Sequence, residues 1–244
     1  MKPVFEHAWD ISIAEAREIQ NRLREQVQLT PLKKLPKTVA AVDVSYTRWD
    51  RMGYAVLGIF EILYDNRKSP VMLKELLIET MTGAVASPYI PGYLSFREIP
   101  MLLPLFERID LDFDVMLVDG VGIAHPRGLG LAAHLGLLFD KPSIGCAKSR
   151  LIGDYREPRL NKGDTSPLYI DKRRVGTVIR SKQNCRPLFV SPGHKCTVAD
   201  AARLVLSLCF NYRLAEPIRR VDLMSKQLRK TIHKSGEWNE KVIS

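Results

Sequence analysis

The 244-residue sequence has no long apolar segment, and no run approaches the roughly 18 residues that a membrane-spanning helix needs. Residues 1–10 also lack the apolar stretch of a secretory signal. We therefore expect a chain that does not span a membrane and is not exported by this route. The expected location is the cytoplasm, with the nucleus as the alternative in a eukaryotic cell.

Cysteine is scarce as well. None of the 4 cysteines forms a Cys-x-x-Cys pair or lies at zinc-ligand spacing from a histidine. A disulfide framework and a structural zinc are therefore not expected. Internal repeats, low-complexity tracts and long linkers are also absent, which favours one compact domain over residues 1–244.

Basic residues are in excess, with 37 Lys and Arg against 27 Asp and Glu and a formal net charge of +10. A cationic surface attracts polyanions, so nucleic acid or an anionic membrane surface would be the first partner to test. A solvated basic surface is the alternative. Disorder is excluded as the whole account because 45% of the residues are hydrophobic, enough for a sizeable core.

The first half of the chain predicts one helix, three strands and a second helix. A capping box at Ser12-Ile-Ala-Glu15 begins an amphipathic helix that we expect to run to about Gln28 and to end at Thr30-Pro31. Strands follow at 39–46, 54–63 and 71–81, and their short connections imply antiparallel pairing. Region 94–109 is helical in composition, but Pro100 and Pro104 predict a break or kink near Ile99.

Strands and helices alternate in the second half. Strands are expected at 113–119 and 143–147, around a helix at 131–139. A polar loop at 154–166 precedes strands at 174–181 and 187–190, and helices then run from Thr197 to about Tyr212 and from Glu216 to about His233. This order predicts the α/β class, with a mixed sheet of three antiparallel strands followed by parallel βαβ units and flanked by helices.

Asp43 and Asp119 are the first candidate functional residues. Asp43 interrupts the apolar run that begins at Val39, and a carboxylate there is tolerated if it binds a cation, pairs with a base or takes up a proton. Asp119 ends an apolar strand and opens the glycine-rich segment 120–130, and strand ends are where ligands of open α/β sheets bind. The alternatives are a buried ion pair for Asp43 and a helix N-cap for Asp119.

Glu98 and Lys148 extend this group. Glu98 follows the segment Ser87-Pro-Tyr-Ile-Pro-Gly92, whose prolines would hold Tyr89 exposed and ready to stack on a base. Lys148 directly follows strand 143–147 and should emerge at the same sheet edge as the aspartates. Three carboxylates and a lysine on a basic chain indicate hydrolysis of a phosphodiester with oxygen-ligated divalent metals. The alternatives are a solvated Glu98 and a Tyr89 packed into the core.

Two histidines and a glycine-rich segment are less informative. His125 and His194 lie in predicted loops and could serve in acid–base chemistry or phosphate contact, although a loop histidine is more often polar surface. Segment 120–130 lacks the Gly-Lys-Ser/Thr of a P-loop, and Gly120-Val-Gly122 matches the dinucleotide fingerprint only in part. We therefore expect no small-molecule cofactor.

Five segments carry a family resemblance that spans nearly the whole chain in order. They are Ala41-Val-Asp-Val-Ser45, Pro88-Tyr-Ile-Pro-Gly-Tyr-Leu-Ser-Phe-Arg-Glu98, Val118-Asp-Gly-Val-Gly-Ile-Ala-His-Pro-Arg127, Ile144-Gly-Cys-Ala-Lys-Ser-Arg-Leu151 and Ser191-Pro-Gly-His194. Together they resemble the endonuclease V family of deoxyinosine-directed repair nucleases. The second and third segments are specific to it. Two departures are Val121, where the family often has a polar residue, and Cys146, where it has Val.

The resemblance implies a ribonuclease H-like fold, dependence on Mg²⁺ or alternatively Mn²⁺, and a role in DNA repair. The implied substrate is inosine-containing DNA, with RNA as the alternative, and no membrane partner is implied. Cleavage is expected at the second phosphodiester bond 3′ to inosine, leaving 3′-hydroxyl and 5′-phosphate ends. Protein partners are not predicted.

The resemblance also assigns roles to single residues. It implies that Asp43, Glu98 and Asp119 are catalytic metal carboxylates, that Asp222 is a further metal ligand, and that Lys148 is a catalytic lysine. Other residues are expected to contact the substrate. Tyr89 would fill the space left by an extruded base, and the remaining contacts would come from Gly92, Leu94, Gly120, Gly122, His125, Gly145, Leu151 and His194.

Two other interpretations stay open. One is a nuclease of the same fold that recognises flaps or mismatches, and the other is a nucleic-acid-binding module without activity, against which the intact acidic residues and lysine argue. Basic residues near the C-terminal half are expected either to contact phosphates or to be solvated. These residues are Lys172, Arg173, Arg174, Arg180, Lys182, Arg186, Arg219, Arg220, Lys226, Arg229 and Lys230.

Overall fold

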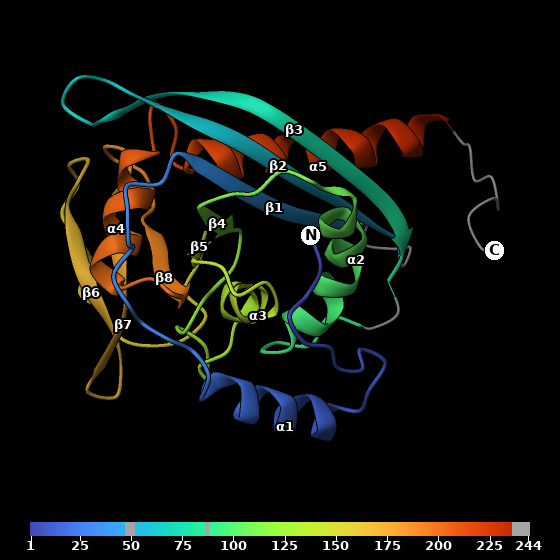
Figure 1. Ribbon diagram of the computed structural model, residues 1–244. Coiled ribbons are helices and arrows are strands. Elements are labelled where there is room, and N and C mark those ends of the chain that lie inside the picture. Colours follow the sequence, from blue (N-terminus) through green and yellow to red (C-terminus); the bar gives the residue numbers. More distant parts are fainter. Residues whose placement is uncertain (47–51, 86–87, 236–244) are drawn as a thin grey trace.

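The computed structural model describes residues 1–46, 52–85 and 88–235. Within these residues eight strands form one mixed sheet in the order β3-β2-β1-β4-β5-β8-β7-β6 (Figure 1). Most of the connection between the first two predicted strands, residues 47–51, and Ser87 of the proline segment lie outside the described residues.

The sheet has antiparallel pairs on both sides of a parallel centre. β1 (Thr38–Tyr46), β2 (Met52–Tyr64) and β3 (Pro70–Ala84) are antiparallel neighbours, which confirms the prediction for the first three strands. β4 (Val115–Val118) pairs parallel to β1, and β5 (Ser143–Ala147) pairs parallel to β4. Because parallel strands end at the same edge of a sheet, the residues that follow β4 and β5 come close to the end of β1.

Two strands differ from the sequence prediction. β6 (Thr165–Ile170) is not among the predicted strands; it begins in the last two residues of the predicted loop at 154–166, and it contains Pro167. An edge strand tolerates proline because one side of its backbone needs no hydrogen-bond donors, and β6 is at the edge of the sheet. β8 (Leu188–His194) is longer than predicted, so His194 lies in a strand and not in a loop. β7 (Arg173–Ile179) pairs antiparallel with both.

The first helix begins where the sequence predicts, and the second helix runs on where a break is one of the expected outcomes. α1 (Ile13–Arg24) begins at the predicted capping box, in which Ser12 Oγ accepts a hydrogen bond from the Glu15 amide, but it ends before the predicted Gln28. α2 (Leu94–Arg108) continues through both of its prolines, so the helix does not break near Ile99, and the alternative of a kink there stays a prediction. Each proline removes one backbone hydrogen bond. Burial stabilises α2 by about 1.5–3 kcal/mol for each large apolar side chain, and the helix buries Phe96, Ile99, Leu102, Leu105 and Phe106.

The remaining helices cover both faces of the sheet. α3 (Leu131–Leu138) packs with α2 on one face, and α4 (Val198–Ser207) and α5 (Glu216–Ser235) cover the other (Figure 1). α1 lies outside α3, against which it buries Leu23.

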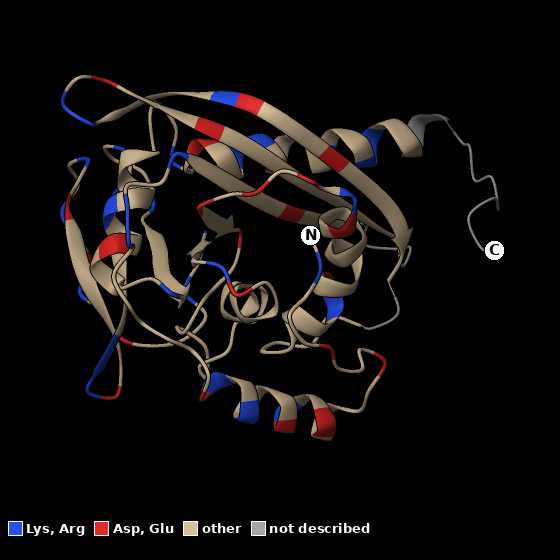
Figure 2. Cartoon of the chain, in the orientation of Figure 1, with Lys and Arg blue, Asp and Glu red and all other residues tan. Residues whose placement is uncertain are grey.

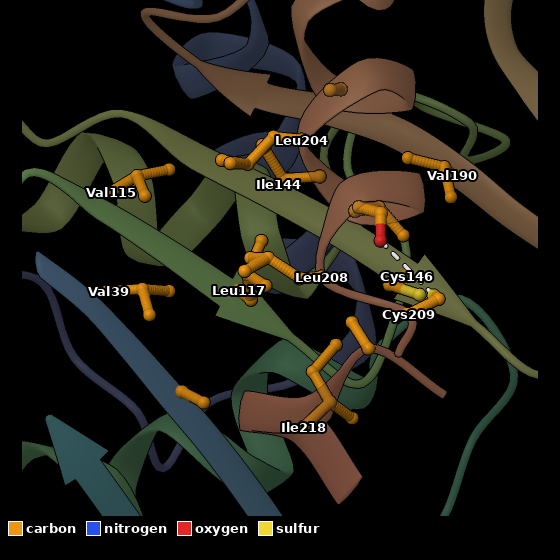
Figure 3. Close-up of a cluster of buried hydrophobic side chains, with 14 of the residues drawn as sticks. Val39, Val115, Leu117, Ile144, Cys146, Val190, Leu204, Leu208, Cys209 and Ile218 are labelled. Atoms are coloured by element: carbon orange, nitrogen blue, oxygen red, sulfur yellow. Dashed lines mark hydrogen bonds between the residues drawn. The ribbon is translucent and has the colours of Figure 1, made fainter. Parts of the chain in front are cut away.

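Side chains of the central strands alternate between the two faces. Val39 and Ala41 of β1 belong to the cluster under α4 and α5, whereas Ala40 and Val42 belong to the cluster under α2 and α3. Figure 3 shows the first cluster, in which Leu204 of α4, Leu208 at the C-terminal cap of that helix and Ile218 of α5 meet strand residues such as Leu117, Ile144 and Val190. The strands that carry the candidate aspartates are therefore anchored from both sides.

Charged residues lie mainly outside this core. Lys and Arg are interspersed with Asp and Glu along α1 and α4, whereas basic residues predominate in α5 (Figure 2). No helix among the described residues is long and apolar enough to cross a membrane.

Candidate active site

Three carboxylates from distant parts of the chain converge at one end of the sheet. Asp43 lies in β1, Asp119 directly follows β4, and Asp222 lies in α5, and one oxygen atom from each lies within 4.8 Å of the others. Because Val42 pairs with Val118 in the parallel register, Asp43 and Asp119 occupy the next position on the two strands. The topology of the sheet thus brings together residues 43 and 119, and the docking of α5 adds residue 222.

Lys148 bridges two of these carboxylates. Its ammonium group donates hydrogen bonds to Asp119 and, at 2.6 Å, to Asp222 Oδ1. The backbone of Lys148 is held as well, because Arg213 Nη2 donates to its carbonyl oxygen at 2.5 Å and to the Pro187 carbonyl at 2.8 Å. The lysine is therefore fixed at both its backbone and its charged end.

Hydroxyl and ammonium groups tie α5 to the site. Ser225 Oγ donates a hydrogen bond to the carboxylate of Asp43, and Ser45 Oγ donates to the Ser225 carbonyl at 3.0 Å. Lys226 Nζ donates to the second oxygen of Asp222 at 2.7 Å. These contacts set the position of Asp222 relative to β1.

Burial and mutual repulsion shift the pKa values of the aspartates. Burial raises the pKa of Asp43 to about 6, and the nearby charges of Asp119 and Asp222 act in the same direction. Burial also raises the pKa of Asp119 despite its contact with Lys148. Burial alone would raise the pKa of Asp222, but hydrogen bonds from Lys148 and Lys226 bring it below its usual value. Crowded carboxylates of this kind are stabilised in the ionised form by added positive charge.

Glu98 lies beside this group but is not one of the three converging carboxylates. It is buried in α2, and burial raises its pKa well above the usual value, with further contributions from the charges of Asp43 and Asp119. The guanidinium of the preceding Arg97 stacks on the Tyr46 ring at 4.2 Å. The structure therefore places Glu98 within electrostatic reach of the cluster.

The donor set fits a divalent cation. Carboxylate oxygens are the ligands that Mg²⁺ and Mn²⁺ prefer, and three of them converge here. The Lys148 ammonium between Asp119 and Asp222 demonstrates that positive charge is stabilised at this position.

A small pocket of about 50 Å³ is lined in part by residues that lie two or three positions from Glu98, Asp119 and Lys148 in the sequence. Among the predicted substrate-binding residues it is lined by Tyr89, Gly92, Leu94, His125 and Leu151, and Tyr89 and Leu151 are exposed. Val121, one of the two departures from the family pattern, also lines it. The remaining lining residues, which the sequence did not single out, are Ser95, Leu129, Gly130 and Leu131. A larger cavity of about 860 Å³ beside β6 contains none of the candidate carboxylates.

Three side chains hold the proline segment against the pocket through one carbonyl group. The Gly92 carbonyl oxygen accepts hydrogen bonds from Gln20 Nε2 at 3.0 Å, His125 Nε2 at 3.0 Å and Arg127 Nη2 at 2.6 Å. Gly92 has a φ of +82°, which favours glycine. Gln20 is fully buried and also accepts from Arg127 Nε at 2.5 Å. Sequence reasoning missed Gln20 because a glutamine in an amphipathic helix is typical of an exposed face.

The three remaining glycines lie outside the lining of the pocket. A Cβ on Gly122 would lie 2.0 Å from the Pro192 carbonyl oxygen, and one on Gly145 would lie 2.5 Å from the Gly122 nitrogen. A Cβ on Gly120 would make ordinary contact with Leu131 at 3.5 Å. Gly122 and Gly145 therefore allow the loop after Asp119 to pass close to β5 and β8.

His194 is not brought to the site. It pairs with Ser143 at the start of β5, whereas Lys148 follows the other end of that strand. Its ring accepts a hydrogen bond from the Gln28 amide at 3.3 Å and contacts Asp140 at 3.3 Å. These contacts tie β8 to the chain after α1.

Several predicted phosphate-contact residues have partners within the protein. Arg180 is buried and donates to Glu157 at 2.7 Å and to the Pro158 carbonyl at 2.9 Å, so its assignment to a solvent-facing basic cluster is wrong. Arg219 and Arg220 both pair with Glu216.

A mixed sheet with clustered carboxylates and a lysine at its parallel strand ends, next to a pocket between two loops, defines a nuclease of the ribonuclease H-like class. Comparison with known proteins narrows this class. The sequence model of the endonuclease V family matches residues 21–223. Endonuclease V of Alkalilimnicola ehrlichii is 45% identical over 223 residues, which are 90% of this chain and 93% of that protein.

Solved structures agree with the sequence match. The endonuclease V structure from Streptomyces avermitilis is 31% identical, with a TM-score of 0.83 over 96% of this chain and 100% of that one. Endonuclease V of Ciona intestinalis, crystallised with a 24mer DNA containing an inosine followed by a ribo-adenosine, is 27% identical, with a TM-score of 0.74 over 90% and 98% of the two chains. This chain belongs to the endonuclease V family, and it is an enzyme of the nuclease class.

Proposed function

We propose that this protein is an endonuclease that recognises inosine in DNA and hydrolyses the second phosphodiester bond on its 3′ side, leaving 3′-hydroxyl and 5′-phosphate ends. One observation carries the proposal: the two segments that supply most of the pocket lining also carry two of the four candidate carboxylates, Glu98 and Asp119. Val121 of the pocket follows Asp119 by two residues, and Ser95 of the pocket precedes Glu98 by one helical turn. A base held in the pocket would place its neighbouring phosphates close to the acidic cluster.

The relative from Ciona intestinalis supports the choice of substrate, because it was crystallised with inosine-containing DNA. DNA is accordingly the proposed partner, and RNA is the alternative that the same pocket admits. A pocket of about 50 Å³ is smaller than the roughly 300–1,000 Å³ of typical small-molecule sites, so the exposed Tyr89 and Leu151 at its rim move outward when a purine enters. Rotation of the base out of the stack is how enzymes generally inspect a single base.

The acidic residues would hold Mg²⁺, with Mn²⁺ as the alternative. Asp43, Asp119 and Asp222 would be ligands, and Glu98 would add a fourth carboxylate from the side of α2. A divalent metal supplies activation of water and neutralisation of charge at the scissile phosphate. Lys148 keeps Asp119 and Asp222 in position and offsets negative charge beside the phosphate.

Tyr89 has a separate role in the proposal. Its side chain is 60% exposed at the rim of the pocket, on a segment that Pro88 and Pro91 restrict and that the Gly92 carbonyl anchors. An aromatic ring in this position stacks in the space that the extruded base leaves. The extruded state is thereby favoured over the stacked one.

Mapping of the cut tests the proposal. End-labelled DNA and RNA strands with a single inosine, and matched strands with adenosine or guanosine, are incubated with the protein and Mg²⁺, and the product ends are identified. We expect one cut at the second bond 3′ to inosine and none in the matched strands. Equal cutting of flap or mismatch substrates without inosine would instead indicate a structure-directed nuclease.

A further inference from the structure

The hydroxyl group of Ser95 is buried and has no hydrogen-bond partner. Ser95 is the second residue of α2, only 2% of its surface is exposed, and its Oγ contacts no donor or acceptor in the described structure. A hydroxyl that is removed from water without a partner is unfavourable. Such groups are rare in folded proteins, so a bound ligand that forms a hydrogen bond with Ser95 Oγ would explain this one.

Ser95 lies in the wall of the pocket, and that wall is otherwise short of free polar side chains. Among the described residues of the lining, the other side chains with a polar group are those of His125 and Tyr89. Both ring nitrogens of His125 are engaged, because Nε2 donates to the Gly92 carbonyl and Nδ1 accepts from the Arg127 amide at 3.2 Å. Tyr89 is at the exposed rim. The other side chains of the lining are apolar, namely Leu94, Val121, Leu129, Leu131 and Leu151.

The start of α2 gives this part of the pocket a donor character. The N-cap residue Tyr93 makes no capping hydrogen bond with its side chain, so the first turn of this 15-residue helix has no side-chain acceptor at its cap. Helix N-termini carry partial positive charge and favour groups with partial negative charge. A hydroxyl group can both donate and accept a hydrogen bond. Because the backbone N–H groups of the first turn lie beside Ser95, a ligand atom that accepts hydrogen bonds is favoured here over an amino group.

We propose that Ser95 is a specificity-determining residue that donates a hydrogen bond from Oγ to the keto oxygen at C6 of an extruded hypoxanthine. The inference rests on the proposed function and deepens it. Hypoxanthine has an oxygen at C6, where adenine has an amino group, so this contact separates the deaminated base from its parent. The buried Oγ without a partner in the free protein is then satisfied by the substrate.

The contact between Ser95 and the oxygen at C6 is tested by changing the enzyme and the substrate base separately and together. The substrates are two strands that differ in one base, hypoxanthine or unsubstituted purine, which has hydrogen in place of the oxygen at C6. For Ser95→Ala we expect kcat/KM on the hypoxanthine strand to fall about tenfold, and on the purine strand to stay within about twofold. Ser166→Ala, which removes another buried serine hydroxyl remote from the pocket, should leave the preference between the strands unchanged.

Two results would overturn the inference. If kcat/KM of Ser95→Ala falls equally on both strands, Ser95 only contributes to packing. If kcat/KM falls on neither strand, Ser95 does not take part in recognition of the base. Failure of the wild-type protein to cut the hypoxanthine strand would instead overturn the proposed function itself. If the alanine variant does not fold, Ser95→Cys provides the same comparison, since it keeps the size of the side chain and replaces the hydroxyl by a weak donor.

Discussion

The side chain of Gln20 donates a hydrogen bond to the carbonyl oxygen of Gly92, joining α1 to a segment 72 residues further along the chain. The same side chain donates to the Leu129 carbonyl at 3.4 Å, so it connects both loops that form the pocket. A peripheral helix thus sets the geometry of the pocket. This relationship leads to the first prediction.

Gln20→Ala should weaken binding of an inosine-containing strand about five- to tenfold, because the Gly92 carbonyl and Arg127 each lose a buried partner. The turnover number of bound substrate should change less than affinity, since no carboxylate is touched. Fluorescence anisotropy and single-turnover kinetics measure the two effects. Asn21→Ala, an exposed position on the same helix, is the matched control. An affinity equal to that of the control would contradict the role of Gln20.

Tyr89→Ala should weaken binding of an inosine-containing strand by about 1–3 kcal/mol, the usual range for the loss of one stacking contact. Binding of a strand without inosine should change much less, because no base is extruded from it. Titrations with both strands test the difference, with Tyr212→Ala as a control at another exposed tyrosine. If the two strands lose affinity equally, Tyr89 does not stack in a vacated space.

Removal of divalent metal with a chelator should abolish cleavage, and added Mg²⁺ or Mn²⁺ should restore it. Ca²⁺ should restore binding better than cleavage, because it accepts oxygen ligands with a looser geometry. The measurement is cleavage of an inosine strand after dialysis against chelator and readdition of each ion. Full activity in excess chelator would contradict the assignment of the acidic cluster.

A buried histidine with a partly buried histidine partner predicts a pH effect on stability. His134 in α3 is fully buried, its Nε2 shares a hydrogen bond with His7 Nε2 at 2.8 Å, and burial lowers its pKa well below 6.5. The unfolded chain therefore binds more protons than the folded one near pH 6, so this contribution is full above about pH 6.5 and is lost as pH falls. The raised pKa of Asp43 acts in the opposite direction.

Comparison with His134→Gln isolates the histidine. Between pH 7.5 and pH 5 the difference in unfolding free energy between wild type and this variant should narrow by about 1–2 kcal/mol, since one pKa unit corresponds to about 1.4 kcal/mol. Urea unfolding at the two pH values measures it. A difference that does not change with pH would mean that His134 does not resist protonation.

The antiparallel pairing of the first three strands and the convergence of several candidate site residues could be predicted, because both follow from local patterns. Asp43 and Asp119 stand out since each interrupts or ends an apolar strand, and Lys148 follows a third such strand. Parallel strands that end at one edge then bring such residues together. Asp222 came only from the family resemblance, because an acidic residue in a basic amphipathic helix has no local signature.

The features that could not be predicted from the sequence depend on contacts between residues far apart in the chain. α2 continues through Pro100 and Pro104 because its apolar face is buried on the sheet, and β6 forms despite Pro167 because it lies at the edge. Ser95 and Gln20 act through partners or a pocket distant in sequence, so neither their burial nor their role could be inferred from neighbouring residues.

The central claim is that the clustered carboxylates hold the metal needed to hydrolyse a strand whose inosine base is bound in the pocket. The most direct measurement is single-turnover cleavage of an inosine-containing strand by Asp43→Ala and Asp119→Ala, with the exposed Asp110→Ala as control. Each of the first two variants should fold and bind the strand yet lose at least about a thousandfold in cleavage rate, because charge that holds the metal is removed without loss of apolar packing. The control should cut at the wild-type rate. Wild-type turnover by a folded Asp43→Ala or Asp119→Ala protein would contradict the account.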